Sequence, residues 1–246
     1  MSQTIASSLA TLYVEANESS LATGVAPSLM QGFPAELKHR VTWHNWMRAP
    51  FNQWGFRNLA RLRPSIDVAA GPGPVGTLKD APKALESLCF DSECGLSISV
   101  IDHLVASQTD AFLVMQGDTV LFERYFNGQR ACDRHIMFSV TKSLIGTLGE
   151  QLVTEGVLRP ELPAAYYVPE LAGSAFGDAT VRQLFDMAVG IDYSEVYDDP
   201  NSESSQYGYA CGFQPAPATY AQFESLYQYL PSLKKRGSHG GFFHYV

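Results

Sequence analysis

The chain has 246 residues, of which 46% are hydrophobic and 17% charged, a composition typical of a folded globular protein. Its formal net charge of −8 argues against nucleic acid and anionic membrane surfaces as partners, because both attract basic patches. No apolar run approaches the roughly 20 residues that span a bilayer. The first Lys or Arg is Lys38, so the N-terminus lacks the basic start of a secretory signal, and we expect a cytoplasmic protein.

The N-terminal part of the chain is uneven in composition. Residues 1–40 are rich in Ser, Ala and Thr, with a helical pattern over 5–13, and the aromatic residues of 46–62 indicate an ordered segment. Residues 71–76 are Gly- and Pro-rich and predict a linker or tight turn. They also have the glycine spacing of a dinucleotide-binding loop. Pro72 and Pro74 lack the N–H groups that such a loop presents, so we expect no nucleotide cofactor.

A helix and a hairpin are predicted next. Residues 96–108 carry apolar side chains at helical spacing and could cover one face of a sheet. Two strand patterns, Ala111–Gln116 and Thr119–Tyr125, are joined by Gly117 and Asp118, a connection suited to a two-residue hairpin turn. The order is therefore a helix followed by an antiparallel hairpin.

Ser139 stands three residues before Lys142, at the predicted start of another helix. Positions i and i+3 share one helix face, so the hydroxyl and the amine can meet. A lysine activates a serine only when its own pKa is depressed by burial or nearby positive charge. Apolar residues then recur at helical spacing and predict a buried helix, with glycines for close packing and a stop at Gly156. These positions are Val140, Leu144, Ile145, Gly146, Leu148, Gly149, Leu152 and Val153.

The Ser-x-x-Lys spacing occurs a second time, at Ser232 and Lys235. Basic residues and glycines follow it up to position 241, which indicates a flexible, solvated loop rather than a catalytic site. On spacing alone, the first copy could equally be an ordinary helix N-terminus with an exposed lysine.

The segment that follows predicts helices and long loops. Thr180 is a plausible N-cap for a helix over 181–187, and Gly190 a plausible stop. Residues 193–203 are acidic and turn-rich, and we interpret them as a solvated loop whose spacing fits no calcium site. Structural roles are expected for Asp186 and Asp192.

This order of elements resembles the β-lactamase and penicillin-binding-protein superfamily of serine hydrolases, whose first motif is a Ser-x-x-Lys pair. Residues 46–198 resemble, more specifically, the class C-related branch of esterases and 6-aminohexanoate-dimer hydrolases. The matching runs are Trp-Met-Arg-Ala-Pro at 46–50, Phe-Ser-Val-Thr-Lys-Ser at 138–143, Tyr-Val-Pro-Glu-Leu at 167–171, Thr-Val-Arg-Gln-Leu-Phe-Asp-Met at 180–187 and Gly-Ile-Asp-Tyr-Ser-Glu-Val-Tyr at 190–197.

The resemblance implies an α+β fold with an antiparallel sheet flanked by helices. We expect residues 1–95 to be an N-terminal extension packing on the core, 96–138 the first part of the sheet domain, and 139–246 the nucleophile helix with a mostly helical region. The family's third motif lies on a later strand that the chain lacks. We therefore expect an N-terminal portion of a longer enzyme, its C-terminal strands missing, poorly soluble and inactive alone. The alternative is a complete, divergent small protein.

The same resemblance implies the site. Ser139 would be the nucleophile and Lys142 its base. The run Gly-Phe-Phe-His-Tyr at 241–245 fits the lead-in to the family's second motif, so Tyr245 would share the proton transfer. Tyr197 would line the substrate cleft. The implied substrate is a small linear amide or ester, and 6-aminohexanoate oligomers are the first candidates. A carboxylesterase with weak β-lactamase activity and a non-catalytic acyl-accepting sensor stay open.

Other chemistry finds little support in the sequence. No Gly-x-Ser-x-Gly elbow exists for a Ser-His-Asp hydrolase. Neither His39 with His44 nor His239 with His244 has a zinc-ligand pattern, so no metal is expected. The four cysteines, Cys89, Cys94, Cys132 and Cys211, lack paired metal-ligand spacing and should be thiols in a reducing compartment, a bridge between the first two being improbable. The sequence leaves the oligomeric state open.

Overall fold

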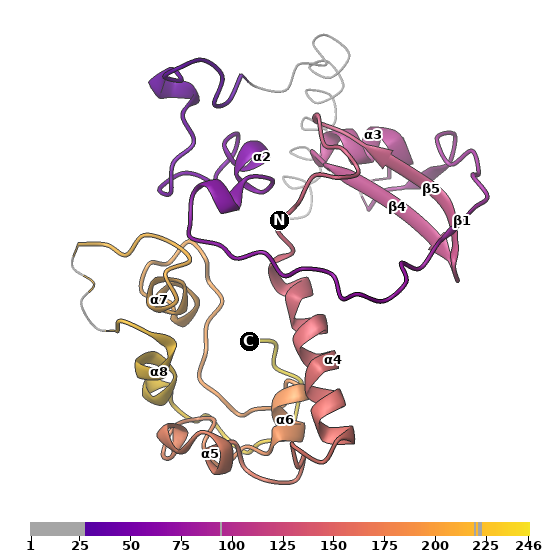
Figure 1. Cartoon of the computed structure of the whole chain (residues 1–246). Coiled ribbons are helices and arrows are strands. Elements are labelled where there is room, and N and C mark those ends of the chain that lie inside the picture. The colour runs from indigo at the N-terminus through magenta and orange to yellow at the C-terminus, as the bar shows by residue number, and fades with distance from the viewer. Residues whose placement is uncertain (1–27, 94, 219, 221–222) are drawn as a thin grey trace. The chain divides into compact units, whose positions relative to one another are not determined.

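The computed structural model describes residues 28–93, 95–218, 220 and 223–246. The chain forms two compact units, unit 1 (Met1–Ile136) and unit 2 (Met137–Val246) (Figure 1). The helix expected over residues 5–13 lies outside the described residues, and so does Cys94. None of the described helices is long and apolar enough to cross a membrane.

The first described segment of unit 1 is built around the buried ring of Trp46. Trp46 is 1% exposed, stacks on Trp43 with ring centroids 5.5 Å apart, and meets Phe56 edge-on. A Cβ on Gly55 would lie 2.4 Å from the carbonyl oxygen of Trp46, so only glycine fits this approach. The expectation of an ordered aromatic segment is confirmed. Its short elements are η1 (Leu37–His39), α2 (Asn52–Gly55) and η2 (Leu59–Arg61).

The hairpin forms where the sequence predicts it. Strands β4 (Ala111–Gln116) and β5 (Thr119–Tyr125) pair antiparallel, and Gly117 in the turn has a φ of +60°, which glycine adopts without strain. A third strand, β1 (Lys79–Asp80), pairs with β5 in parallel, giving the order β1-β5-β4. The hairpin supplies the antiparallel pairing expected, and the two-residue β1 adds a parallel pair, so the sheet is mixed. Residues 71–76 are exposed, with no helix or strand, as predicted.

The helix predicted over 96–108 is shorter. Residues 97–99 form strand β3 (Ser97–Ser99), which pairs with β2 (Cys89–Asp91). Helix α3 (Val100–Ala106) begins only after Ser99, whose hydroxyl accepts from the backbone N–H of Asp102. The cap and the strand pairing together set the start four residues later than the apolar spacing suggested.

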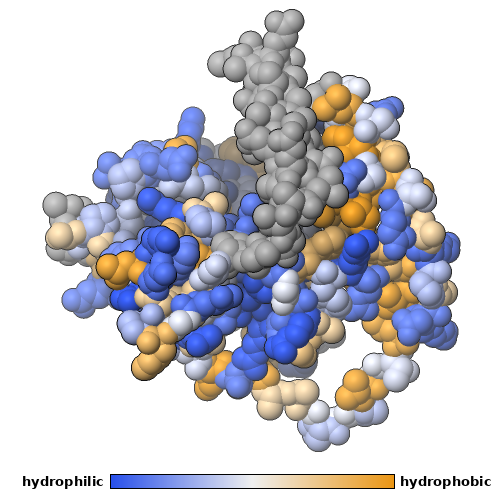
Figure 2. Space-filling view, turned by 90° about the horizontal axis from the view of Figure 1, so that it is seen from above, coloured by the Kyte–Doolittle hydropathy of each residue, from blue (hydrophilic) through white to orange (hydrophobic). Residues whose placement is uncertain are grey.

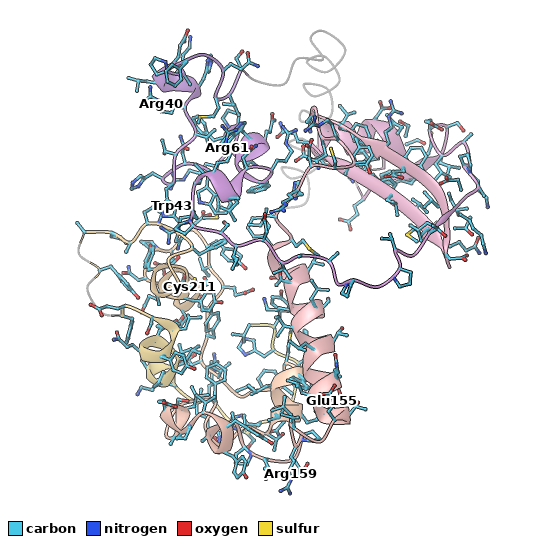
Figure 3. All side chains as sticks on the ribbon, viewed as in Figure 1. Arg40, Trp43, Arg61, Glu155, Arg159 and Cys211 are labelled. Atoms are coloured by element: carbon cyan, nitrogen blue, oxygen red, sulfur yellow. The ribbon has the colours of Figure 1, made fainter. Side chains whose placement is uncertain are left out.

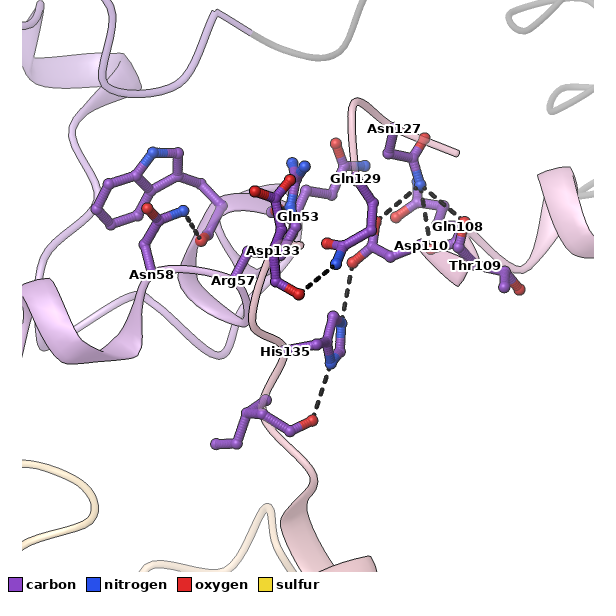
Figure 4. Close-up of polar contacts among 12 residues, drawn as sticks. Gln53, Arg57, Asn58, Gln108, Thr109, Asp110, Asn127, Gln129, Asp133 and His135 are labelled. Carbon is purple, nitrogen blue, oxygen red and sulfur yellow. Dashed lines mark hydrogen bonds and ion pairs between the residues drawn. The ribbon is translucent and has the colours of Figure 1, made fainter. Parts of the chain in front are cut away.

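A network of polar contacts holds the end of β5 against the loop before β4 (Figure 4). Asn127 Nδ2 donates to the backbone oxygens of Gln108 and Thr109 and to Asp110 Oδ1. His135 Nε2 lies 3.0 Å from Asp110 Oδ2. These contacts join residues 108–110 to the segment that follows β5.

The regular elements of unit 2 are helices, joined by long loops. Its long helix is α4 (Thr141–Thr154), preceded by the 3-10 turn η3 (Phe138–Val140). The elements after it are α5 (Ala164–Tyr167), η4 (Pro169–Leu171), α6 (Val181–Phe185), α7 (Glu203–Ala210), α8 (Leu226–Tyr229) and η5 (Leu230–Ser232).

Helix α4 ends where the sequence predicts, next to Gly156. Gly156, with a φ of +76°, donates to the oxygen of Val153, while Val157 donates to that of Leu152. This pair of bonds is a Schellman motif, so the predicted stop is confirmed. Figure 3 shows Glu155 at this end of the helix and Arg159 just beyond it.

The predicted burial of α4 is wrong for most of its length. Leu144 and Ile145 are 60% and 64% exposed, and Leu148 is exposed as well. Gly149 is buried because the ring of Phe185 on α6 packs against it, at 2.5 Å from where a Cβ would stand. Helix α6 is short and covers only this face of α4, which leaves the apolar stripe uncovered in unit 2. Other large hydrophobic residues are exposed too, and Figure 2 shows hydrophobic side chains at the surface.

Helix α6 begins as predicted but ends early. Thr180 and Gln183 form a capping box, each side chain bonding to the other residue's backbone N–H. The helix ends at Phe185 because Met187 takes a φ of +49°, so Gly190 is not the stop. Gly190 instead sits where a Cβ would come within 2.7 Å of the oxygen of Ser238.

Residues 232–241 are ordered, which corrects the flexible loop expected there. Asp192 N–H donates to the oxygen of Lys234, and Arg236 N–H donates to that of Gly190. Leu233 belongs to the buried core of unit 2, and Lys235 pairs with Asp178. Backbone pairing with 190–192 thus orders a stretch that its composition suggested to be mobile. The core consists of Ala175, Ala179, Val189, Ile191, Ala210, Tyr229 and Leu233.

Candidate active site

Ser139 lies in the 3-10 turn immediately before α4, and Lys142 lies in the first turn of that helix. Lys142 Nζ is 3.0 Å from Ser139 Oγ and donates to it. Phe138, the residue before Ser139, has a φ of +42°, a conformation that is strained for a large side chain and that clusters at functional sites. Its ring packs edge-on against Phe213. The local backbone therefore holds the serine and lysine as the sequence spacing predicted.

Tyr245 reaches the same place from the far end of the chain. Lys142 Nζ donates to its phenol oxygen over 3.2 Å and lies 4.8 Å from the ring centroid. Hydrogen bonding with the Ser139 hydroxyl, and then with the Lys142 ammonium, lowers the pKa of the Tyr245 phenol. The three residues expected to act together are thus brought together in unit 2, with the amine between two oxygens.

Tyr197 lies at the edge of this group and is 75% exposed. Partial burial raises the pKa of its phenol, and the negative charge of Glu195 and a hydrogen bond with that carboxylate raise it further. The charge of Glu195 also acts on Tyr245, where it opposes the lowering of the pKa. Glu195 was not singled out from the sequence, because it stands in an acidic, turn-rich segment that predicts only a solvated loop.

The arrangement suits proton transfer. A single amine contacts a potential nucleophile and a phenol whose pKa is lowered, so the neutral amine and the phenolate are two nearby groups that could accept a proton leaving Ser139. Among the described residues, no group of His, Cys, Asp or Glu has the geometry to hold a metal ion.

Unit 1 has a cavity of its own, of about 520 Å³. It is lined by Asn52, Gln53, Phe56, Ser107, Gln108, Thr109, Asp110, Ala111 and His135, and part of this lining is the network of Figure 4. None of the four residues predicted for the site contributes to it.

Comparison with known proteins places this geometry in a family. Residues 98–245 match the family model described as Beta-lactamase, a range that includes Ser139, Lys142, Tyr197 and Tyr245. The chain belongs to the β-lactamase family. This confirms the resemblance and the α+β fold that it implied.

Two relatives of this β-lactamase-family chain carry similar names. It is 36% identical over 219 residues to a 6-aminohexanoate-dimer hydrolase of Paenarthrobacter ureafaciens, a match that covers 85% of this chain and 51% of the relative. Its structure is similar to that of a putative 6-aminohexanoate-dimer hydrolase from Bacillus anthracis, with a TM-score of 0.75 and 28% identity, covering 83% of this chain and 54% of that one. The chain thus spans about half the length of these relatives.

Proposed function

We propose that this protein is a serine hydrolase that cleaves small linear amides or esters through an acyl-enzyme, with 6-aminohexanoate oligomers as the first candidate substrates. One observation carries the proposal: Lys142 Nζ lies within hydrogen-bonding distance of both Ser139 Oγ and the Tyr245 phenol. The names of the two relatives support the choice of substrate.

The proposed mechanism has two steps. Ser139 Oγ attacks the substrate carbonyl while Lys142, together with Tyr245, takes its proton and passes it to the leaving amine or alcohol. Water then attacks the resulting ester, its proton takes the same route back, and Ser139 is restored. The backbone N–H of Ser139 would donate to the developing oxyanion, a contact typically worth about 3 kcal/mol.

Tyr197 and Glu195 would flank the bound substrate. Both lie near Tyr245, since Tyr245 acts on the pKa of the Tyr197 phenol and the charge of Glu195 acts on the pKa of the Tyr245 phenol. Tyr197 is exposed, so its side chain would be accessible to a substrate amide. Its role is substrate contact rather than proton transfer, because its phenol pKa is raised, whereas that of Tyr245 is lowered.

The nucleophile is tested by labelling. Full-length protein treated with a fluorophosphonate should gain mass on the peptide that contains Ser139, and Ser139→Ala should abolish the gain. Ser143→Ala, one turn further along the exposed surface of α4, is the matched control and should label normally. Labelling of another residue, or of none, would refute the assignment.

Turnover then separates the remaining possibilities. Steady release of p-nitrophenol from p-nitrophenyl butyrate indicates an enzyme, whereas a single burst that stops indicates an acyl-accepting sensor. A higher kcat/KM on 6-aminohexanoate dimer than on the ester supports the amidase. The reverse ranking, with slow hydrolysis of a β-lactam, supports the carboxylesterase.

A further inference from the structure

Tyr245 has no helix or strand to hold it. The segment that carries it, residues 235–246, has no helix or strand beyond one bridge at Lys235. Its backbone is bound instead to residues 187–191: Gly240 N–H donates to the oxygen of Ala188, and His244 N–H donates to that of Met187, both over 2.7 Å. A few long-range hydrogen bonds therefore set the position of the phenol.

His239 makes two further bonds from the middle of this segment. Its Nδ1 lies 3.0 Å from the backbone nitrogen of Gly190, and its Nε2 lies 2.9 Å from Asp178 Oδ1. A backbone N–H can only donate, so Nδ1 accepts and the ring proton stands on Nε2, which donates to the carboxylate. The His239 side chain is 6% exposed, whereas the carboxylate of Asp178 is largely exposed, so the bond to Gly190 is the better shielded of the two.

The two partners of His239 flank α6 in the sequence. Asp178 is two residues before Thr180, the N-cap, while Gly190 follows the helix by five residues. One imidazole therefore ties the Tyr245 segment to both ends of the same short helix.

Helix α6 is in turn fixed to the helix that carries Lys142. The two helices lie side by side (Figure 1). The ring of Phe185 fills the space beside Gly149, and Arg182 pairs with Glu150 at 2.6 Å. A continuous set of contacts thus runs from α4 through α6 to His239 and on to Tyr245, entirely within unit 2.

We propose that His239 is a positioning residue: by bonding to Gly190 and Asp178, it holds the segment of Tyr245 at the distance from Lys142 that proton transfer requires. The effect of His239 on kcat rests on the proposed function, whereas its effect on the position of Tyr245 does not. Displacing a catalytic group by about 1 Å can lower a rate by roughly 100-fold. The two hydrogen bonds of His239 go to Gly190 and Asp178 and not to Ser139, Lys142 or Tyr245.

The test uses three substitutions in the full-length protein. His239→Ala removes both bonds, His239→Asn keeps an acceptor where Nδ1 stands, and His239→Gln keeps a donor where Nε2 stands. We expect His239→Ala to lower kcat on p-nitrophenyl butyrate by roughly 10- to 100-fold with KM within about twofold, and the other two to recover part of the loss. Arg236→Ala, which removes an exposed side chain paired with Asp192 at 3.6 Å in the same segment, is the control and should keep wild-type kcat.

A second readout does not depend on turnover. With 13C in the tyrosine Cζ position, the Tyr245 resonance is assigned by its loss in Tyr245→Phe, and it should shift in His239→Ala and return toward the wild-type position in His239→Asn. Unchanged kcat and an unchanged resonance in His239→Ala would overturn the proposal. The proposal would also be overturned if kcat fell equally in all three variants and the fall matched the decrease in their melting temperatures. If His239→Ala does not fold, the Asn and Gln variants decide between these outcomes.

The two proposals fail separately. A wild-type protein that hydrolyses no ester or amide, and whose Tyr245 resonance nevertheless depends on His239, refutes the proposed function and supports the positioning role. An active enzyme whose kcat and Tyr245 resonance do not change in any of the three variants supports the proposed function and refutes the positioning role.

Discussion

The phenol oxygen of Tyr245 lies 3.2 Å from Nζ of Lys142, although 103 positions separate the two residues in the chain. Lys142 is fixed by a helix, and Tyr245 by hydrogen bonds between two irregular segments. The proton transfer proposed for this site depends on this contact between Lys142 and Tyr245.

Replacing Tyr245 with Phe removes the phenol while keeping the ring beside Lys142. If the phenol shares the proton transfer, kcat/KM on p-nitrophenyl butyrate should fall by about 100-fold or more, the usual scale for losing a general acid-base group. Tyr227→Phe, at an exposed position on α8, should leave the rate unchanged. Wild-type turnover by Tyr245→Phe would exclude the phenol from the mechanism.

The pH dependence should reveal the same group. Hydrogen bonding with Ser139 and Lys142 lowers the pKa of Tyr245 from its ordinary value of 10.0, so its deprotonated form becomes populated at lower pH than that of a free tyrosine. If that form accepts the proton from Ser139, kcat/KM should rise with pH along a limb centred below pH 10. A pH profile of Tyr245→Phe should lack this limb, and a limb that persists in the variant would assign it to another group.

Two glycines of α4 provide a matched test of packing. A Cβ on Gly149 would stand 2.5 Å from the ring of Phe185, whereas one on Gly146 would meet nothing within 4 Å. Gly149→Ala should therefore lower the free energy of unfolding by about 1–3 kcal/mol through overpacking. Gly146→Ala should raise it by about 0.5–1 kcal/mol, because alanine loses less backbone entropy in a helix.

Urea unfolding of both variants measures these free energies. Equal effects of the two substitutions would mean that α4 and α6 do not pack as described.

Asp178 should make stability depend on pH in a defined window. Hydrogen bonds from Lys235, and then from His239, lower the pKa of its carboxyl to about 2. A carboxyl whose pKa is lower in the folded state contributes stability that is full above its unfolded pKa of roughly 4 and is lost as pH falls toward the folded value. The difference in unfolding free energy between wild type and Asp178→Asn should thus be largest above about pH 4 and shrink between pH 4 and 2. A difference that stays constant over this range would contradict the assignment.

The sequence by itself determined the features that depend on neighbouring residues. The hairpin Ala111–Tyr125 has a two-residue turn with glycine where φ is positive, and the end of α4 has its glycine at 156. Ser139 and Lys142 are three residues apart, so the helical path alone brings their side chains together. Each of these was predictable because backbone geometry and local spacing decide it.

The errors arose where distant partners decide the structure. Strand β3 replaced the first turn of a predicted helix because residues 89–91 pair with it. Residues 232–241 are ordered because residues 188–192 bind their backbone. Composition predicted mobility there, since basic and glycine-rich sequences have little tendency to order without such partners.

Only the tertiary structure decided how Tyr245 is held. The resemblance named the residue, but the bonds that place it run through Met187, Ala188, Gly190 and Asp178, and the sequence predicted none of these contacts. Backbone hydrogen bonds between irregular segments leave no pattern in the sequence. A histidine side chain is found both on surfaces and between two hydrogen-bonding partners. Which of these applies to His239 depends on the folding of α6 against α4, which sets where both partners lie.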